Sequence, residues 1–206
     1  MTTKSVETWL FDLADRTPTP GGGAAAGMLA AIGAALIGMV TAYTTGEKWQ
    51  EREPRMRELN AEAAELRSRA LALVGEDEAA FGSVGAAYRM PRSNDAEKSA
   101  RAQAIQAALV GAADPPARIA RVAERLVDIA DELVESGNPN VVSDVGVASA
   151  AAGAALEAAV LNIEINLRQI LDPQVSAGLR SEVAAATEYI RRAEAVTGRV
   201  REAIAQ

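Results

Sequence analysis

The chain has 206 residues, a formal net charge of −7, and neither cysteine nor histidine. Without these two residues it has no disulfide or thiolate chemistry and lacks the commonest general base and metal ligand, so catalysis would depend on Asp, Glu, Lys, Tyr, Ser, Thr or bound water. The negative charge argues against a nucleic-acid partner, and a composition dominated by Ala, Leu, Glu and Arg predicts an all-α protein.

The first predicted helix spans about Ser5–Asp15, where apolar side chains recur at helical spacing. This segment is amphipathic and contains acidic residues, so we expect neither a signal nor a transit peptide, and a cytoplasmic protein. The proline- and glycine-rich segment Thr17–Gly23 then ends the helix.

No charged residue occurs from Thr17 to Gly46, which exceeds the roughly 20 residues that cross a bilayer. The segment is rich in Ala, Gly and Thr, and no basic cluster or aromatic belt brackets it. We therefore predict no membrane span, but a helix over about Ala24–Thr45 that is buried in a bundle or in a subunit interface. Small residues recur every fourth position and would allow close helix approach: Gly22, Ala26, Ala30, Ala34 and Gly38.

Charged, amphipathic helices are predicted next. One runs from about Pro54 to Val74, where Gly75 predicts a kink or a new start. Another follows a cap at Ser93 or Asn94 and reaches about Ala113. A third restarts at Asp114, with Pro115 in its first turn, and reaches Glu135.

A second sparsely charged helix is predicted from Val141 to about Leu171, after the turn Ser136–Asn140. The last helix opens at Pro173 and has a coiled-coil-like apolar seam. With no strand pattern, we predict one domain over residues 1–206: a bundle of long helices around the two sparsely charged central helices. Few aromatic residues make the core thin, which favours self-association, and we expect the turns that open the two central helices to lie at one end.

The first of these turns contains Pro20, Gly21, Gly22 and Gly23 before a helix start. Free N–H groups at a helix N-terminus bind anions, and glycine allows a flat ligand to approach the main chain. The structural interpretation is a helix start with a hinge, since no phosphate-loop lysine and serine follow.

The second turn is polar. Asn140 would cap the helix with Ser143 or Asp144, or these groups and Asn138 would form a polar wall that reads the amide-like edge of a heterocycle.

Other candidates are single charges and one amide pair. Asp77 is expected to open a helix, where the helix dipole stabilises it, or to serve as a base in a cleft. Lys48 follows the uncharged helix and would interact with its C-terminus. Asn162 and Asn166 share a helix face, which favours an interhelical hydrogen bond that fixes register.

Several segments, in this order, resemble the formiminotetrahydrofolate cyclodeaminase / methenyltetrahydrofolate cyclohydrolase family, and most closely its stand-alone bacterial cyclohydrolases. The resemblance covers about residues 5–172. It rests on Thr19–Gly23, Met39-Val40, Thr45-Gly46, Asp77 with Ala80-Phe81, Met90–Arg92, Glu97-Lys98 with Arg101, Ala104–Gln106, Gly137–Ala148 and Asn162 with Asn166-Leu167. Where the family commonly has a lysine-rich run ending in tyrosine, this chain has Glu47-Lys48-Trp49.

The resemblance implies a homodimer that binds a tetrahydrofolate derivative at the subunit interface, with no metal and no tightly bound cofactor. It implies hydrolysis of 5,10-methenyltetrahydrofolate to 10-formyltetrahydrofolate. Asp77 or Asp144 would be the base and Lys48 would protonate a leaving nitrogen. The residues expected to bind substrate are Pro20, Gly21, Gly22, Gly23, Phe81, Asn138, Asn140 and Ser143.

Two alternatives remain open at this point. One is cyclodeamination of 5-formiminotetrahydrofolate to the methenyl form with release of ammonia. The other is a non-catalytic helical dimer that binds folate or a protein.

Overall fold

The computed structural model describes residues 5–205, and every regular element in this range is helical, which confirms the all-α prediction. Residues 1–4 and 206, which the predicted domain includes, lie outside the described residues. The elements are α1 (Val6–Ala14), α2 (Gly22–Ala42), η1 (Glu47–Trp49), α3 (Glu53–Tyr88), α4 (Asp95–Ser136), η2 (Pro139–Val141), α5 (Val142–Leu167) and α6 (Pro173–Ile204).

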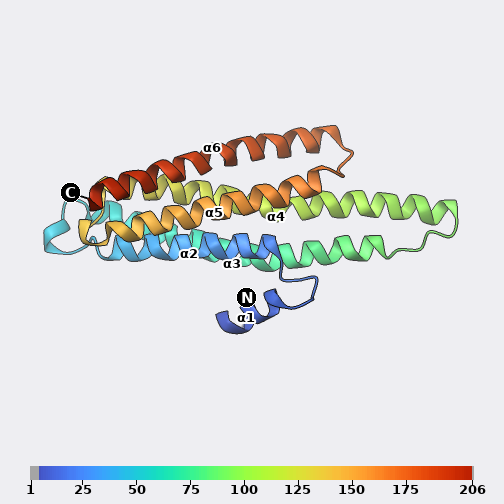
Figure 1. The fold of residues 1–206 in the computed structure, drawn as a ribbon, viewed down its shortest axis with the longest axis horizontal. Coiled ribbons are helices and arrows are strands. Elements are labelled where there is room, and N and C mark those ends of the chain that lie inside the picture. The colour runs from blue at the N-terminus through green and yellow to red at the C-terminus, as the bar shows by residue number, and fades with distance from the viewer. Residues whose placement is uncertain (1–4, 206) are drawn as a thin grey trace.

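The helices α2 and α5 lie side by side and antiparallel (Figure 1). Gly22 at the start of α2 is next to Asn162 near the end of α5, and Val40 near the end of α2 is next to Gly137 just before α5. Helices α3 and α4 form a long hairpin that extends beyond α2 and α5, and α6 packs along α5 (Figure 1). Helix α1 attaches through Trp9, which packs on Ala24 and Val74.

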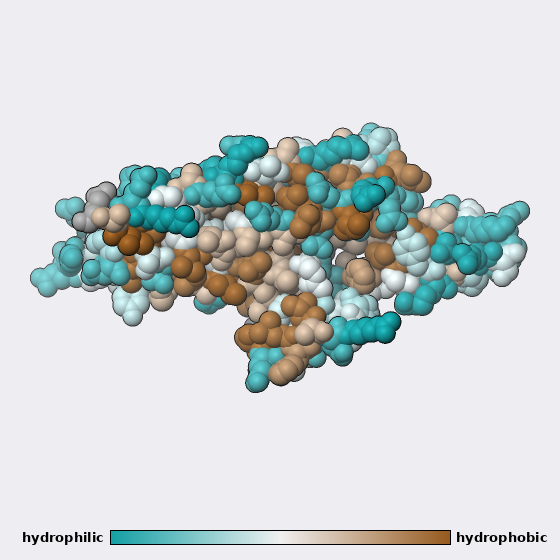
Figure 2. Space-filling view, in the orientation of Figure 1, coloured by the Kyte–Doolittle hydropathy of each residue, from teal (hydrophilic) through white to brown (hydrophobic). Residues whose placement is uncertain are grey.

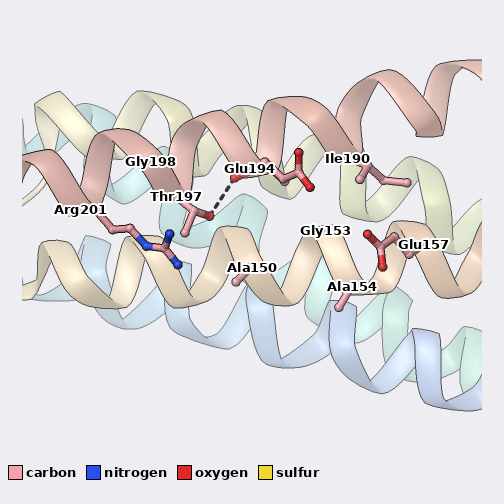
Figure 3. Close-up of a pocket in the computed structure, with 10 residues that line it drawn as sticks. Ala150, Gly153, Ala154, Glu157, Ile190, Glu194, Thr197, Gly198 and Arg201 are labelled. Atoms are coloured by element: carbon pink, nitrogen blue, oxygen red, sulfur yellow. Dashed lines mark hydrogen bonds between the residues drawn. The ribbon is translucent and has the colours of Figure 1, made fainter.

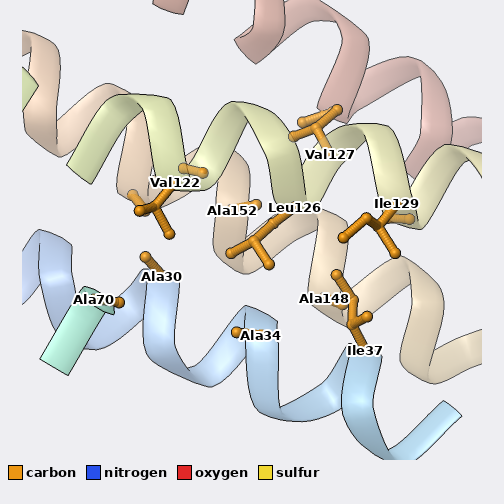
Figure 4. Close-up of a cluster of buried hydrophobic side chains, with 14 of the residues drawn as sticks. Ala30, Ala34, Ile37, Ala70, Val122, Leu126, Val127, Ile129, Ala148 and Ala152 are labelled. Carbon is orange, nitrogen blue, oxygen red and sulfur yellow. The ribbon is translucent and has the colours of Figure 1, made fainter. Parts of the chain in front are cut away.

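The core joins small side chains of α2 and α5 to larger ones of α3 and α4. Ala30, Ala34 and Ile37 of α2 lie near Leu126 and Ile129 of α4 in the buried cluster drawn in Figure 4. Alanines at the interface let the helix axes approach, and the aliphatic side chains fill the space between them. The bundle therefore packs without aromatic rings at its centre.

Glycines at two points in the middle of α2 allow close approach of neighbouring helices. A Cβ atom at Gly27 would lie 2.8 Å from Val74 Cγ2, and one at Gly33 would lie 3.2 Å from the Ala148 carbonyl oxygen. Ala26, Ala30 and Ala34 of the predicted seam are buried. The tightest backbone contacts, however, are at glycines outside that seam.

Two predicted helix breaks are wrong. Helix α3 continues through Gly75, and α4 continues through Pro115 and Pro116. Gly75 disfavours helix by only about 1 kcal/mol relative to alanine, and the buried Leu73 and Val74 hold this turn in place. Both prolines are buried too, so tertiary packing of α4 outweighs the hydrogen bonds that they remove.

The predicted caps have different outcomes. Asn94 caps α4 by accepting a hydrogen bond from Glu97 N–H at 2.9 Å. Asn140 does not cap α5, because the N-cap residue is Val141, and Asn140 instead donates its N–H to Asn138 Oδ1 at 3.0 Å within η2. The polar turn therefore forms a short 3₁₀ helix before α5 begins.

The two turns that open α2 and α5 lie at opposite ends of the bundle, which contradicts the prediction that they share one end. The two helices are antiparallel, so the start of each is next to the end of the other. Helix propensity and hydrophobic periodicity do not contain this information, because it depends on the path of the long α3–α4 hairpin between them.

Large apolar side chains are exposed on α1 and on the outer sides of α2 and α5. Phe11 is 70% and Leu161 is 66% exposed. Val6, Leu10, Ile32, Tyr43, Val147 and Ile165 are exposed with them. Figure 2 shows apolar surface both on α1 and along the face that the bundle turns to the viewer.

By length and composition, α2 and the segment Pro139–Leu167 are apolar enough to cross a membrane. The bundle buries 56% and 44% of their most apolar windows, and the core helix of a soluble protein passes the same test. The absence of a membrane span stays a prediction.

Gly27→Ala is expected to destabilise the fold by about 1–3 kcal/mol, the usual range for overpacking, because its Cβ overlaps Val74. Gly75→Ala is the matched control, since nothing lies within 4 Å of its Cβ position. It should stabilise the helix by roughly 0.5–1 kcal/mol. Urea unfolding of both variants measures this, and equal effects of the same sign would contradict the packing argument.

Candidate active site

A cavity of about 390 Å³ lies where α2 begins and α5 ends, against α3 and α4. Its walls are partly apolar and partly polar. The apolar side chains are Pro18, Phe81, Val84, Leu109, Ala112, Pro116 and Ile165, and the polar ones are Thr19, Asp77, Tyr88, Asn162, Asn166 and Gln169. Backbone of Gly21, Gly22 and Gly23 completes the lining. The cavity therefore combines apolar walls with hydrogen-bonding groups.

The carboxylate of Asp77 lies directly over the first turn of α2. Helix α2 has Gly21 as its N-cap residue and no side-chain cap of its own. Asp77, from α3, instead accepts a hydrogen bond from the Ala24 N–H group. A Cβ atom at Gly23 would lie 2.0 Å from Asp77 Oδ1, so this contact requires glycine. The positive end of the helix dipole faces the carboxylate.

Burial raises the pKa of Asp77 above its ordinary value. The Ala24 N–H lowers the pKa in part, and the neighbouring Glu78 charge raises it further. Among the described residues, Asp77 is the only carboxylate that lines the cavity. A carboxyl group that is held in a cavity with a raised pKa is suited to proton transfer.

Asp77 lies in the interior of α3, not at a helix start as predicted. Val74, one turn earlier, packs with Trp9 of α1 and with Ala24 of α2. Helix α1 therefore packs on α2 and α3 next to the contact between Asp77 and α2.

The structure also places amide side chains and a phenol in the cavity. Asn166 Nδ2 lies 3.5 Å from the Ala112 carbonyl oxygen of α4, the kind of interhelical contact that the Asn162/Asn166 spacing suggested. Tyr88 and Gln169 are joined by a hydrogen bond of 2.8 Å at the outer edge. Tyr88 ends α3 and Gln169 follows α5, so only the folded chain brings them together, and no sequence signal indicates either residue.

The predicted site residues divide into two groups. Asp77, Phe81, Gly21, Gly22 and Gly23 line the cavity, and Pro20 lies between two lining residues without lining it. The other five predicted residues lie near the opposite end of α2, whose 21 residues span about 30 Å. They are Lys48, Asn138, Asn140, Ser143 and Asp144.

At that other end, Asn138 connects the turn before α5 to the end of α2 by two hydrogen bonds. Its Nδ2 donates to the Tyr43 carbonyl at 2.9 Å, and its N–H donates to Thr44 Oγ1 at 3.0 Å. The Lys48 ammonium lies 5.1 Å from the centre of the Trp49 ring. Within one chain, Asp144 and Lys48 do not join Asp77.

A second hollow of about 520 Å³ lies between α5 and α6 (Figure 3). Its floor consists of small residues such as Gly153 and Ala193, and its charged groups, Glu157, Glu194 and Arg201, are on exposed side chains. It lacks both a helix N-terminus and a buried polar group, so the cavity at Asp77 is the better candidate.

Comparison with known proteins identifies the family. The formiminotransferase-cyclodeaminase family model matches residues 5–185. The chain belongs to this family. A methenyltetrahydrofolate cyclohydrolase from Methylorubrum extorquens is 41% identical over 82% of both chains.

Other members of the formiminotransferase-cyclodeaminase family are more distant. The formimidoyltransferase-cyclodeaminase of Rattus norvegicus is 32% identical over 82% of this chain and 31% of its own. A crystal structure of formiminotetrahydrofolate cyclodeaminase from Thermotoga maritima matches with a TM-score of 0.83 and 30% identity, over 98% of this chain and 96% of that one. These relatives are enzymes named for folate chemistry.

Asp77→Asn is expected to raise the melting temperature at neutral pH. With a raised folded-state pKa, the native carboxyl holds its proton more tightly than the unfolded chain does, so this group's contribution to stability falls as pH rises from about 4 through the native pKa. The gain of the variant over the wild type should therefore be larger at pH 7 than at pH 4. Thermal unfolding followed by circular dichroism measures it, and a variant less stable than the wild type at pH 7 would show that capping of α2 outweighs burial.

Proposed function

We propose that this protein hydrolyses 5,10-methenyltetrahydrofolate to 10-formyltetrahydrofolate in one-carbon metabolism, at the cavity that contains Asp77. The observation that carries the proposal is the position of Asp77: a single carboxylate with a raised pKa, held over the N-terminus of α2 in a partly apolar slot. The family to which the chain belongs and its 41% identity to a cyclohydrolase support the choice of substrate.

The reaction needs one group that accepts and returns a proton. The bridge carbon of the substrate lies between N5 and N10 and has amidinium-like positive charge, so it is already electrophilic. Asp77 takes a proton from a water molecule as the water oxygen bonds to that carbon. The carbon–N5 bond of the resulting carbinolamine then breaks. N5 receives the proton held by Asp77, the hydroxyl proton leaves to solvent, and the formyl group stays on N10.

The surroundings of Asp77 suit this role. Its negative charge stabilises the cationic substrate, and its raised pKa makes it a stronger base than an exposed aspartate, so it takes the proton of the attacking water more readily. Phe81 and Ile165 give the cavity apolar walls for a flat ring system, and the backbone of Gly21, which has nothing within 4 Å of its Cβ position, allows a ligand to approach closely. Neither a metal nor a tightly bound cofactor enters this scheme.

Cyclodeamination of 5-formiminotetrahydrofolate is the second candidate, because it forms the same methenyl bridge and needs the same base. The Thermotoga maritima structure that aligns with almost the whole chain has this name. Identity favours hydrolysis: 41% to the cyclohydrolase against 30% to that cyclodeaminase.

A homodimer would complete the site. Large apolar side chains are exposed on α1, α2 and α5, and one of them, Ile165, lines the cavity. Figure 2 shows apolar patches on α1 and along the bundle. Exposed apolar patches of this kind are typical of an interface. If the two-fold axis lies in this interface and crosses α2 at right angles, the two α2 helices are antiparallel across the interface. The cavity of each subunit then faces the far end of its partner, which is where the partner's α2 ends. Lys48 and Asp144 are at that far end, together with Asn138, Asn140 and Ser143. Such a dimer would act in the cytoplasm, without a membrane or nucleic-acid partner.

Loss of the 5,10-methenyltetrahydrofolate absorbance, followed in a buffer that keeps spontaneous hydrolysis slow, tests the activity. Wild-type protein should accelerate it, and Asp77→Asn should reduce kcat by about 10²–10⁴-fold, the usual contribution of a general base. Gly23→Ala should reduce it by roughly 10²-fold because its Cβ displaces the carboxylate.

Gly75→Ala, two residues before Asp77 and in open space, is the control that keeps wild-type turnover. Full activity of Asp77→Asn would overturn the proposal. Ammonia release from the formimino substrate, with no hydrolysis, would favour the second candidate.

Mixed dimers test the shared site. The Asp77→Asn chain and the Asp144→Asn chain carry different affinity tags and are expressed together. Purification through both tags in turn isolates the mixed dimer. If each site takes Asp77 from one subunit and Asp144 from the other, the mixed dimer has one intact site and turnover returns. Sites built within single chains would leave the mixed dimer as inactive as the parents. A fully active Asp144→Asn homodimer would exclude Asp144 from the mechanism.

A further inference from the structure

Two asparagine side chains of α5 face the cavity one helical turn apart. Asn162 lies beside the start of α2, where its Nδ2 would be 3.3 Å from a Cβ atom at Gly22. Asn166 follows at the next turn, about 6 Å further along the helix axis. Both line the cavity that contains Asp77.

The orientation of both amides follows from their hydrogen bonds. Asn162 Nδ2 lies 2.7 Å from the Ala158 carbonyl oxygen, and Asn166 Nδ2 lies 2.9 Å from the Asn162 carbonyl oxygen. A carbonyl oxygen only accepts hydrogen bonds, so the nitrogen of each side chain must face it. Each Oδ1 atom is then the amide atom that points away from the backbone carbonyl, and none of the described residues donates a hydrogen bond to it. The helix thus presents two acceptors of fixed polarity.

Asn166 is held from a second side by α4. Pro116 has no N–H group, so the Ala112 carbonyl lacks the donor that an uninterrupted helix would give it. Asn166 Nδ2 lies 3.5 Å from that carbonyl oxygen. The two hydrogens of this nitrogen therefore face two backbone carbonyls. Turning the amide over would leave the Ala112 carbonyl without a donor and would bring Oδ1 against the Asn162 carbonyl oxygen. The proline of α4 and the asparagine of α5 together fix an acceptor in the cavity wall.

Gln169, at the outer edge, has no such fixed polarity. Its Oε1 is 2.8 Å from the Tyr88 hydroxyl, and a hydroxyl either donates or accepts. Its side chain can therefore turn over, whereas those of Asn162 and Asn166 cannot.

We propose that Asn162 and Asn166 determine specificity for the pterin ring by accepting hydrogen bonds from its N–H groups, with Asn166 bonded to the 2-amino group. The inference rests on the proposed function of the cavity. With the bridge carbon at Asp77, the 2-amino edge is the part of the fused ring system furthest from the reacting atoms. Asn162 is next to Asp77 through Gly22 and Gly23, and Asn166 is one turn further out, so Asn166 meets that edge.

Two ligands and three proteins test this assignment. The ligands are tetrahydrofolate and its 2-desamino analogue, and calorimetry gives the Kd of each for the wild type, Asn166→Leu and Asn60→Leu. The wild type should bind the analogue about 3- to 10-fold more weakly, the range of one hydrogen bond. Asn166→Leu, of similar size but without the acceptor, should bind both ligands with similar Kd. Asn60 is the matched control, because its Nδ2 bonds to the Gly38 carbonyl at 2.8 Å outside the cavity. Asn60→Leu should keep the wild-type ratio.

The outcomes separate the two proposals. The deciding quantity is the Kd of the 2-desamino analogue divided by the Kd of tetrahydrofolate. A value near one for the wild type, or the wild-type value in Asn166→Leu, would overturn the role of Asn166 while leaving the folate site intact. Failure of wild-type protein to bind tetrahydrofolate at all would overturn the proposed function, and this inference with it. If Asn166→Leu does not fold, Asn166→Ser gives the same comparison, because its hydroxyl still reaches the Asn162 carbonyl.

Discussion

The contact between the Asp77 carboxylate and the first turn of α2 determines how the site is built. Helix α2 begins with glycines and has no side-chain cap of its own, so a side chain from α3 satisfies the Ala24 N–H. The same contact holds a carboxylate inside a partly apolar cavity, where it would otherwise be unfavourable. Gly23 makes it possible, because any side chain there would occupy the position of the carboxylate. One hydrogen bond thus caps a helix and positions the reactive group.

Close packing of small residues supports this arrangement. Gly27 and Gly33 bring α2 against α3 and α5, and the buried alanines between them leave no room for larger side chains. Rigid neighbours hold the start of α2, and therefore the Ala24 N–H, in a fixed place relative to α3. The apolar outer side of the same helix layer stays exposed in the single chain, and the proposed dimer would cover it.

The sequence was sufficient for the helical class, for most helix positions and for the segments that reach the cavity through Gly21–Gly23 and Asp77. It was insufficient where tertiary packing outweighs local propensity: Gly75 and Pro115 read as breaks, yet both lie inside long helices. Hydrophobic periodicity also does not indicate whether two helices that are distant in sequence pack parallel or antiparallel. The turn at Asn138 was therefore predicted at the wrong end, and Tyr88 and Gln169, which meet only in the folded chain, gave no signal.

The antiparallel pairing of α2 with α5 has a mechanical consequence in the proposed dimer. Each α2 would begin in one site, at Gly22, and end beside the residues that complete the other, at Tyr43 and Asn138. Close packing of α2 against α3 and α5 at Gly27 and Gly33 restricts its bending. A ligand that shifts the start of α2 therefore shifts its end by the same amount, so the occupancy of one site would be transmitted to the second through a single element.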